Sequence, residues 1–266
     1  MPGVSPKPAG SPVWIELSST DPAESARFYQ SLLGTTTTEP HPAFGGYRNL
    51  LHGGAIVAGL MDAQNGMPSS WVVYLLTNDI DETITMAEQH GGGALVSPMD
   101  VKGLGKMAFA QDPSGAIVGL LQPATDQGIG VEDEPGTPTW YELHTTTAYN
   151  ETIAYYEKVF GWTTSVLSDS EEFRMVTFGE GDDAQAGIFD TSGTATSGAT
   201  SAWQVYFAVD DVDRAADVVR IEGGTVVDEP TDTEYGRMVN VLDSTGAAFS
   251  LIRLPEEPGR EEPNRG

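Results

Sequence analysis

The second half of this chain repeats the first, and this duplication constrains the fold more than any other feature of the sequence. Trp14–Leu17 recurs as Trp140–Leu143, and all later matches follow in the same order. The offset changes only from 126 residues (Trp14 to Trp140) to 132 residues (Trp71 to Trp203). The other matched segments are Phe28-Tyr29 with Tyr155-Tyr156, Leu33-Gly34 with Phe160-Gly161, Gly92–Val96 with Gly223–Val227, Gly105–Met107 with Gly236–Met238, and Asp112–Ala116 with Asp243–Ala247. Chance does not place so many landmarks in one register, so the chain is a tandem repeat.

Two domains follow from the repeat, and the length of 266 residues also favours them. We expect domain 1 at residues 12–123 and domain 2 at 138–254, joined by a linker at 124–137 that is rich in Gly, Pro and acidic residues. The segment 255–266 is charged, rich in Pro and poor in apolar residues, which predicts a disordered tail.

The hydrophobic pattern of the first half predicts one order of elements twice in succession. The expected helices span 22–33 and 80–91, and the expected strands lie near 13–18, 35–39, 45–50, 55–61, 71–77, 94–97, 106–111 and 116–122. Asp21 and Asp79 are typical helix caps, and Gly34 is a typical helix end. The Asp-Pro-Ser-Gly turn at 112–115 and the Asp-Ser-Thr-Gly turn at 243–246 favour hairpins. The expected fold class is therefore α+β, with two βαβββ units in each domain.

The charge of the chain argues against several classes of partner. It has 39 acidic and 13 basic residues, for a formal net charge of −26, which disfavours nucleic acid and anionic membrane surfaces. A well-solvated acidic surface explains this charge better than attraction of a cationic ligand, because the acidic residues are spread along the chain. No apolar run approaches the roughly 18 residues of a membrane helix, and the first residues lack an export signal. Without cysteine there are no disulfides or thiolate sites, and we expect a soluble, cytoplasmic monomer or homodimer.

A set of short motifs carries a family likeness. A short strand precedes a Thr-Asp-Pro helix that ends in Phe-Tyr-x-x-x-Leu-Gly, and a Val-x-Asp-x-Asp helix and an Asp-Pro-x-Gly hairpin follow. This ordered set resembles the glyoxalase, bleomycin-resistance and ring-cleaving dioxygenase superfamily, also called vicinal oxygen chelate (VOC), over residues 12–123 and 138–254. The Trp-x-Glu-Leu and Trp-x-x-Tyr segments are similar to its tandem branch, often labelled hydroxylase or glyoxalase-like. The resemblance implies that each pair of βαβββ modules forms a cupped mixed β-sheet with flanking helices.

The resemblance also implies where a metal ion would bind. Metal enzymes of this superfamily carry His, Gln or Glu at the start of the first and fifth strands, and Glu on the fourth and eighth. In this chain the first-, fifth- and eighth-strand positions fall on Trp14, Val72 and Gly119 in domain 1, and on Trp140, Gln204 and Ser250 in domain 2. The fourth strands, near 55–60 and 184–189, contain no Glu. We therefore expect no metal ion and no other cofactor.

Two acidic residues and one histidine are the candidate catalytic groups. Strand alternation places Glu142 and His144 on one face, where they could form an acid–base pair near neutral pH. Glu16 is the counterpart of Glu142 in domain 1. The alternative is that both carboxylates are structural acceptors inherited through the duplication and that His144 is simply exposed. This alternative is favoured, because a catalytic pair needs burial and orienting partners that a sequence does not display.

Aromatic side chains that could hold a flat apolar ligand recur at matched positions. The candidate ligand-binding residues are Trp14, Tyr47, Trp71, Tyr74, Trp140, Trp203, Tyr206 and Phe207, together with Gln204. Because strand alternation separates Trp71 from Tyr74, part of this set is expected to lie in the core. Lys106 and Arg237, each between Gly and Met, could anchor an anionic group, although surface cations usually do not.

Three function classes remain open. The leading hypothesis is metal-independent binding of a small molecule, a partly aromatic metabolite or antibiotic, in the manner that the resemblance to bleomycin-resistance proteins implies. The second is an enzyme with hydroxylase-like, lyase or glyoxalase activity on a small carbonyl compound, using Glu142 and His144. The third is an interaction or structural protein whose cups are filled. The sequence contains no dinucleotide fingerprint, Walker loop or nucleophile elbow.

Overall fold

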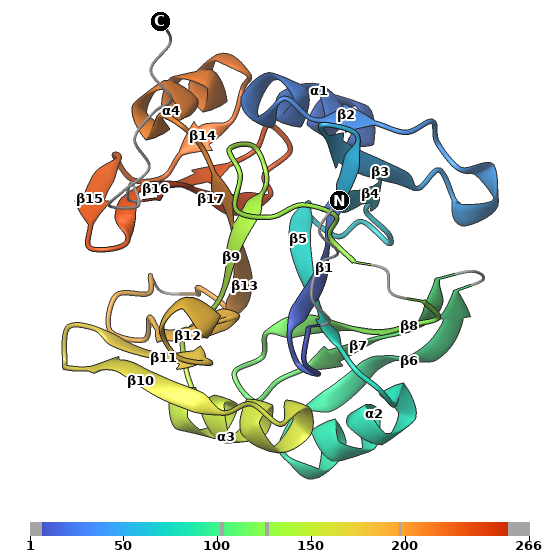
Figure 1. Ribbon diagram of the computed structural model, residues 1–266, viewed down its shortest axis with the longest axis vertical. Coiled ribbons are helices and arrows are strands. Elements are labelled where there is room, and N and C mark those ends of the chain that lie inside the picture. Colours follow the sequence, from blue (N-terminus) through green and yellow to red (C-terminus); the bar gives the residue numbers. More distant parts are fainter. Residues whose placement is uncertain (1–6, 102–103, 126–127, 197, 255–266) are drawn as a thin grey trace, which may run out of the picture.

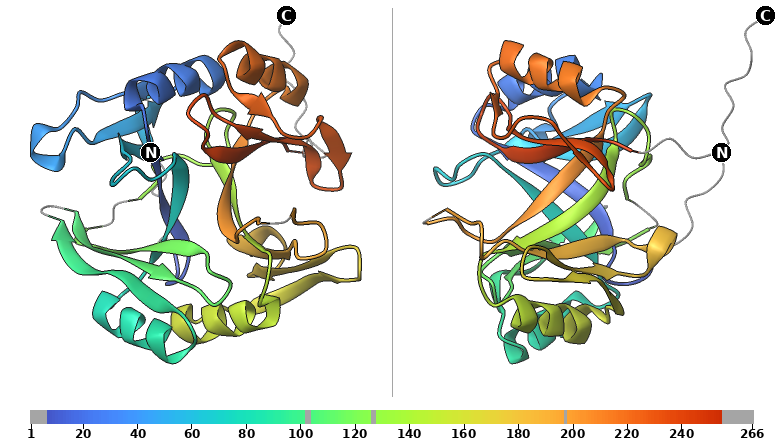
Figure 2. Two further views of the ribbon diagram at one scale, coloured as in Figure 1. Left: turned by 180° about the vertical axis from the view of Figure 1, so that it is seen from behind. Right: turned by 90° about the vertical axis from the view of Figure 1, so that its left-hand side faces the viewer.

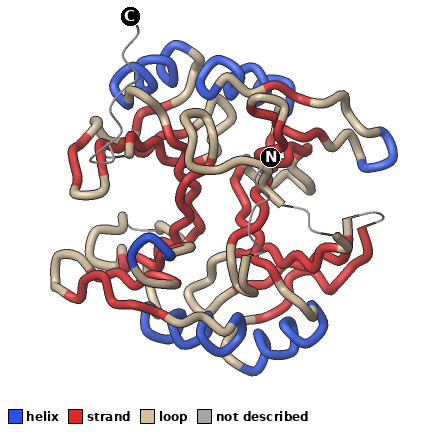
Figure 3. The backbone as a smooth tube through the Cα atoms, viewed as in Figure 1, coloured by secondary structure: helices blue, strands red, loops and turns tan. Residues whose placement is uncertain are grey.

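Two mixed β-sheets, one from each half of the chain, stand side by side with helices at two ends of the molecule (Figures 1 and 3). The computed structural model describes residues 7–101, 104–125, 128–196 and 198–254, so the tail predicted at 255–266 lies outside the described residues. The α+β duplication predicted from the sequence is confirmed. Within the described ranges, no helix combines the length and the apolar character needed to cross a membrane.

The first sheet has eight strands in the order β2-β3-β4-β1-β5-β8-β7-β6. Its elements are β1 (Pro12–Ser19), α1 (Pro22–Leu33), β2 (Thr36–Thr37), the 3-10 turn η1 (Pro42–Phe44), β3 (Arg48–His52), β4 (Ala55–Asp62), β5 (Ser70–Leu76), α2 (Ile80–Gln89), β6 (Gly93–Val101), β7 (Gly105–Gln111) and β8 (Ile117–Pro123). Strand β1 pairs parallel with β4 and antiparallel with β5. The two βαβββ modules therefore meet at the β1–β5 pair in the middle of the sheet.

The second sheet follows the same plan, with the order β10-β11-β12-β9-β13-β17-β16-β14 and with β15 paired to β16. Its elements are β9 (Pro138–Thr145), α3 (Tyr149–Phe160), β10 (Thr164–Asp169), β11 (Arg174–Phe178), the 3-10 turn η2 (Gly181–Asp183), β12 (Ala186–Asp190), β13 (Ala202–Ala208), α4 (Val212–Ile221), β14 (Thr225–Val226), β15 (Thr231–Thr233), β16 (Gly236–Leu242) and β17 (Ala248–Arg253). Strand β9 pairs parallel with β12 and antiparallel with β13, as β1 does in the first sheet.

The last module departs from the repeat at its edge strand. Strand β6 runs for nine residues, whereas the matching stretch of domain 2 forms two short strands, β14 and β15. Pro230 directly precedes β15 and has no N–H to donate to a neighbouring strand. In β6, Pro98 lies where the pairing with β7 shifts register between Val96 and Met99, so the edge strand continues past it.

The helix boundaries expected from Asp21, Asp79 and Gly34 are confirmed in domain 1. The Asp21 side chain accepts a hydrogen bond from Glu24 N, and α1 ends at Gly34 in the left-handed conformation. The Asp79 side chain accepts from the backbone N–H groups of two α2 residues. Helix α3 has no such cap and begins after Ala148, whose φ is +53°.

Each sheet buries one face against the helices and the other domain. Helix α1 lies beside α4 at one end of the molecule, and α2 lies beside α3 at the other (Figures 1 and 2). Strands β5 and β13 are in contact between them, with the rings of Trp71 and Phe207 5.3 Å apart. A single cluster of buried apolar side chains runs through both domains. The remaining face of each sheet points away from the other domain, so the two free faces lie on opposite sides of the molecule (Figure 1).

Candidate functional site

The free face of each sheet carries the same four residues at its centre. We call the free face of the first sheet cup 1 and that of the second sheet cup 2. In cup 1, Trp14 lies opposite Tyr74 across the β1–β5 pair, and Glu16 lies opposite Gly59 across the β1–β4 pair. In cup 2 the corresponding residues are Trp140 opposite Tyr206, and Glu142 opposite Gly187. Alternation along β1 and β9 sends these side chains to the free face and their neighbours into the core.

Glu16 is a buried carboxyl in cup 1 with tyrosine partners. Glu16 is only 6% exposed, and Tyr74 Oη donates a hydrogen bond to Glu16 Oε1 at 3.1 Å. Burial raises the pKa of Glu16, and the hydrogen bonds from Tyr74 and Tyr47 offset only part of this effect. Neither tyrosine carries a positive charge that would stabilise the carboxylate. The surroundings of Glu16 therefore shift its equilibrium toward the protonated, neutral form.

Glu142 is equally buried in cup 2 but has a histidine partner. His144 Nε2 lies 2.7 Å from Glu142 Oε1, and Tyr206 Oη donates to the same oxygen at 3.0 Å. Trp140 Nε1 donates to Glu142 Oε2 at 3.2 Å. Burial by itself would raise the pKa of Glu142, but the hydrogen bond and positive charge of His144, with the Trp140 and Tyr206 donors, hold it below its usual value. The predicted Glu142–His144 pair is thus brought together by the fold.

Beside the shared centre, cup 1 has an apolar wall. Phe109 on β7 lies opposite Gly119 on β8, which in turn lies beside Tyr74 on β5. The rings of Tyr74 and Phe109 are 5.6 Å apart. The next row carries Met107 opposite Leu121. Further apolar side chains on this face are the partly buried Val72 and the exposed Val96 (36%) and Met99 (47%), which pair with β7 at Phe109 and Met107. Cup 1 therefore presents adjoining apolar side chains that remain accessible.

Cup 2 has a polar row in the same place. Asn240 on β16 lies opposite Ser250 on β17, which lies beside Tyr206 on β13. Ser250 Oγ donates to Asn240 Oδ1 at 2.7 Å and accepts from Gln204 Nε2 at 3.0 Å. Gln204 and Asn240 keep part of their surface exposed. This row gives cup 2 hydrogen-bonding side chains where cup 1 has apolar side chains and a glycine.

Several residues singled out in the sequence lie away from the cups. Trp71 and Trp203 face the domain interface, where their Nε1 groups donate to Tyr29 Oη at 2.9 Å and Tyr156 Oη at 3.2 Å. Phe207 is buried against Trp71. Lys106 and Arg237 lie on strand positions that alternate with the cup residues, and they form ion pairs with Asp81 and Asp213 at the starts of helices α2 and α4. Tyr47 does reach cup 1, where its hydroxyl lies over Gly59 near Trp14 Nε1.

The residues present do not fit a divalent-cation site of the kind implied by the resemblance. Within the described ranges, no three His, Asp or Glu side chains gather in one place. An added Cβ at Gly59 would overlap Tyr47, and one at Gly119 would overlap the Tyr74 ring. The space that a Glu on β4 or β8 would need is therefore filled by tyrosine in cup 1. In cup 2, a Cβ at Gly187 would overlap Met175, and Ser250 takes the eighth-strand position.

The sequence reasoning missed the walls of the cups. Phe109, Asn240 and Ser250 were not among the expected ligand-binding residues, yet they lie in the same rows as the central Tyr residues, and Met107 lies in the row next to Phe109. A signal was present, because counting outward from the two hairpin turns places Phe109 and Asn240 at equivalent positions of β7 and β16. Using it required the strand register, which only the fold supplies.

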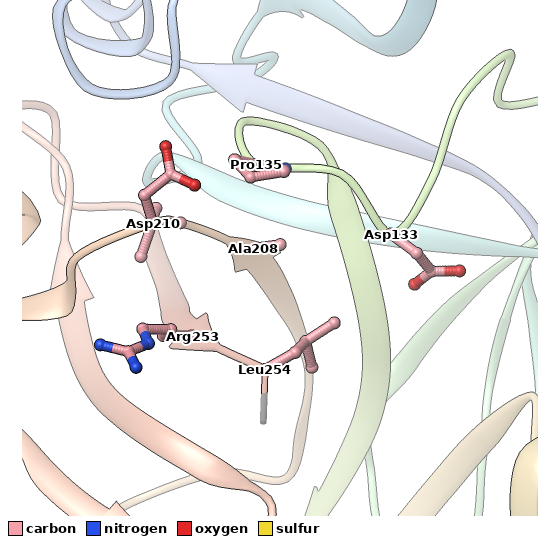
Figure 4. Close-up of a pocket in the computed structure, with 7 residues that line it drawn as sticks. Asp133, Pro135, Ala208, Asp210, Arg253 and Leu254 are labelled. Atoms are coloured by element: carbon pink, nitrogen blue, oxygen red, sulfur yellow. The ribbon is translucent and has the colours of Figure 1, made fainter. Parts of the chain in front are cut away.

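Two cavities lie outside both cups. One, of about 410 Å³, is found between the linker and the ends of β13 and β17, and is lined by Asp133, Pro135, Ala208, Val209, Asp210, Arg253 and Leu254 (Figure 4). The other, of about 260 Å³, lies between α2 and the end of α3. Neither lining includes a residue that the sequence marked as a site. Both are less suited to an aromatic ligand than cup 1, because Phe160 in the second is the only ring among these lining residues.

Comparison with known proteins agrees with the repeat and with the fold. Residues 11–120 and 143–251 match the Glyoxalase/Bleomycin resistance protein/Dioxygenase superfamily. The chain is 36% identical over 270 residues to the anthracycline biosynthesis protein DauV of Streptomyces sp. (strain C5), covering 93% of this chain and 94% of DauV. It is 35% identical over 269 residues to the anthracycline biosynthesis protein DnrV of Streptomyces peucetius, with the same coverage.

A solved structure shows the same fold at low sequence identity. The Mn(II)-bound glyoxalase from Novosphingobium aromaticivorans superposes with a TM-score of 0.64 at 15% identity, over 92% of this chain and 82% of that chain. Together with the match over both halves of the sequence, this confirms the resemblance seen in the motifs. The chain belongs to the glyoxalase/bleomycin resistance protein/dioxygenase superfamily.

Proposed function

We propose that this protein binds a small, partly aromatic molecule in cup 1 without a metal ion. The observation that carries the proposal is the accessible apolar wall of Phe109, Met107 and Leu121 beside the Trp14–Tyr74 pair. Flat rings bind where large apolar side chains surround a few fixed polar groups, and here Glu16 is the fixed polar group. Metal independence is supported by the tyrosine rings that take the place of carboxylate ligands.

The relatives suggest the size of the ligand. DauV and DnrV are anthracycline biosynthesis proteins, and an anthracycline aglycone is a flat, uncharged, fused-ring molecule. An uncharged probe also avoids the nonspecific attraction that a net charge of −26 exerts on cations. We therefore choose an anthracycline aglycone as the first probe.

The test is a titration of the full chain with the aglycone, followed by tryptophan fluorescence and by thermal unfolding. Saturable quenching should accompany a rise in the unfolding temperature, because a ligand that binds only the folded state stabilises it. Phe109→Asn should weaken binding about tenfold or more, since a phenyl contact is worth about 1.5–3 kcal/mol. Val166→Asn is the matched control, because Val166 is an apolar residue on β10 that is 71% exposed. Equal binding by both variants and the unaltered chain would contradict the placement in cup 1.

A second candidate function is an enzyme acting on a small carbonyl compound in cup 2. The 2.7 Å contact between His144 Nε2 and Glu142 Oε1 favours it, because Glu142 orients the imidazole, and the neutral form of that imidazole can accept a substrate proton through its other nitrogen. Turnover of methylglyoxal, abolished by Glu142→Gln and retained by Glu16→Gln, would support this candidate. Turnover that Glu142→Gln leaves unchanged would remove the pair from the mechanism.

A further inference from the structure

The two cups share a frame, and four of their matched positions differ in size or polarity in a way that bears on ligand binding. Residues at the centre are the same: Trp, Glu, Tyr and the Gly opposite Glu. The four pairs, from cup 1 to cup 2, are Ser18 and His144, Val72 and Gln204, Phe109 and Asn240, and Gly119 and Ser250. All four changes add to cup 2 a polar group or a larger one.

The added groups form two hydrogen-bonded sets that face the same ligand space. His144 contacts Glu142, and Gln204, Ser250 and Asn240 form a row beside Tyr206. His144 is partly exposed, so the ring nitrogen that does not contact Glu142 can bind a ligand hydroxyl. A site lined with hydrogen-bonding groups rejects ligands that leave those groups unpaired, whereas an apolar wall has no such preference.

The cups also face in opposite directions, so one small molecule cannot occupy both. They open on opposite sides of the molecule, with the buried contact between β5 and β13 separating them (Figures 1 and 2). A ligand of cup 2 and a ligand of cup 1 therefore bind at separate sites.

We infer that cup 2 is a second binding site, specific for a small molecule that presents a hydroxyl group to His144, Glu142 and the Gln204–Ser250–Asn240 row. The inference rests on the proposed function, because it treats the free face of each sheet as a ligand site. It adds that the duplication has produced two sites of different chemistry, one apolar and one selective for hydroxyl groups.

A matched pair of ligands and a matched pair of reporters test this directly. The probes are 2-naphthol and 2-methoxynaphthalene, which have the same ring system and differ in the hydroxyl proton. The reporters are the methyl groups of Met107 in cup 1 and Met238 in cup 2, which occupy equivalent positions opposite Leu121 and Ile252. The full chain is labelled with ¹³C at the methionine methyl groups, and the two signals are assigned with Met107→Leu and Met238→Leu.

We expect the Met238 signal to respond to 2-naphthol with an affinity at least about tenfold higher than to the ether, because the ether leaves polar groups of cup 2 unpaired. The Met107 signal should respond to both compounds with affinities within about threefold. Equal response of Met238 to both probes, or response to neither, would overturn the inference. If neither probe changes the Met107 signal, the proposed function is overturned, whatever the Met238 signal shows.

Exchange of one wall residue provides the second arm. Asn240→Phe gives cup 2 the wall of cup 1, so the preference of Met238 for 2-naphthol should fall to less than about threefold while the Met107 response stays unchanged. Ser250→Gly, which gives cup 2 the other wall residue of cup 1, should reduce the preference in the same direction if Asn240→Phe does not fold. A full tenfold preference in a folded Asn240→Phe variant would contradict the role of this row.

Discussion

Glu16 and Glu142 are at matched positions of the two domains, yet their surroundings shift their pKa values in opposite directions. Both are buried, and both accept a hydrogen bond from the tyrosine on the neighbouring strand. Burial raises the pKa of Glu16, whereas His144 holds the pKa of Glu142 below its usual value despite burial. A single difference at the residue two places along the strand, Ser18 against His144, accounts for most of this contrast.

The two carboxyls should therefore affect stability with opposite dependence on pH. The pKa of Glu16 is higher in the folded state than in the unfolded state, so its ionisation destabilises the fold as pH rises through the folded pKa. Glu16→Gln removes that cost, so the free energy of unfolding of the variant should rise relative to the unaltered chain as pH increases above the usual glutamate pKa of about 4. Denaturant unfolding at several pH values measures this difference.

Glu142→Gln should behave in the reverse way. The folded-state pKa of Glu142 is lowered, so its charge contributes stability that is present above the unfolded pKa and is lost as pH falls through the folded pKa. The substitution should cost about 1–3 kcal/mol at neutral pH, and the loss should shrink below about pH 4. A pH-independent loss for both variants would show that the hydrogen bonds matter and the charges do not.

Gly119 is required where the Tyr74 ring lies against the backbone of β8. Gly119→Ala places a methyl group in contact with that ring, which must shift and lose its hydrogen bond to Glu16. The expected destabilisation is about 1–3 kcal/mol, with weaker ligand binding in cup 1. Gly93→Ala is the control, because a Cβ there meets no atom within 4 Å, and it should change stability by less than about 0.5 kcal/mol. Equal stability of the two variants would show that Tyr74 adjusts freely.

At the scale of elements, several of the residues that recur in the two halves of the sequence form the contacts between the two domains. Tyr29 Oη on α1 donates to Asp243 Oδ2 in the hairpin of the other domain at 3.1 Å, and Tyr156 Oη on α3 donates to Asp112 Oδ2 at 3.0 Å. Trp71 and Trp203 complete these contacts as donors to the tyrosines. The domain interface therefore uses three kinds of repeated residue twice: the helix tyrosine, the Trp of Trp-x-x-Tyr, and the Asp of Asp-x-x-Gly.

Loss of one interdomain hydroxyl should be costly, and a neighbouring tyrosine provides the control. Tyr29→Phe leaves Trp71 Nε1 and Asp243 Oδ2 without their partner and should cost about 1–3 kcal/mol. Tyr155→Phe removes a buried hydroxyl that has no hydrogen-bond partner among the described residues, so it should be neutral or stabilising. The comparison is made by chemical denaturation, and a larger cost for Tyr155→Phe would contradict the assigned interface contacts.

The sequence was sufficient to predict the elements but not their partners. Asp21, Asp79 and Gly34 act locally, so the helix ends that they define followed from the sequence alone. Glu142 and His144 lie on one strand, so their proximity also followed from alternation. By contrast, the partner of Trp71 comes from helix α1 of the other module, and the wall residue Phe109 reaches Tyr74 from two strands away. These contacts depend on register and packing, which a single sequence does not display.

At the scale of the whole molecule, the duplication has kept one architecture and changed its contents. The pairing of α1 with α4 and of α2 with α3 leaves both cups free on opposite sides (Figure 1). The first cup has tyrosine rings where a metal enzyme would need carboxylates, and the second has a glutamate held by histidine. Both arrangements underlie our proposal that the cups bind organic ligands through side chains alone.

The most direct test of this account is the binding of the anthracycline aglycone to metal-free and metal-loaded protein. The chain is treated with EDTA and dialysed, and the dissociation constant is measured by fluorescence before and after addition of Mn(II). We expect the two constants to agree within about twofold, because the proposed ligand contacts in cup 1 are aromatic and apolar side chains around Glu16. Stoichiometric metal in either domain, with binding lost on its removal and restored by its return, would contradict the account.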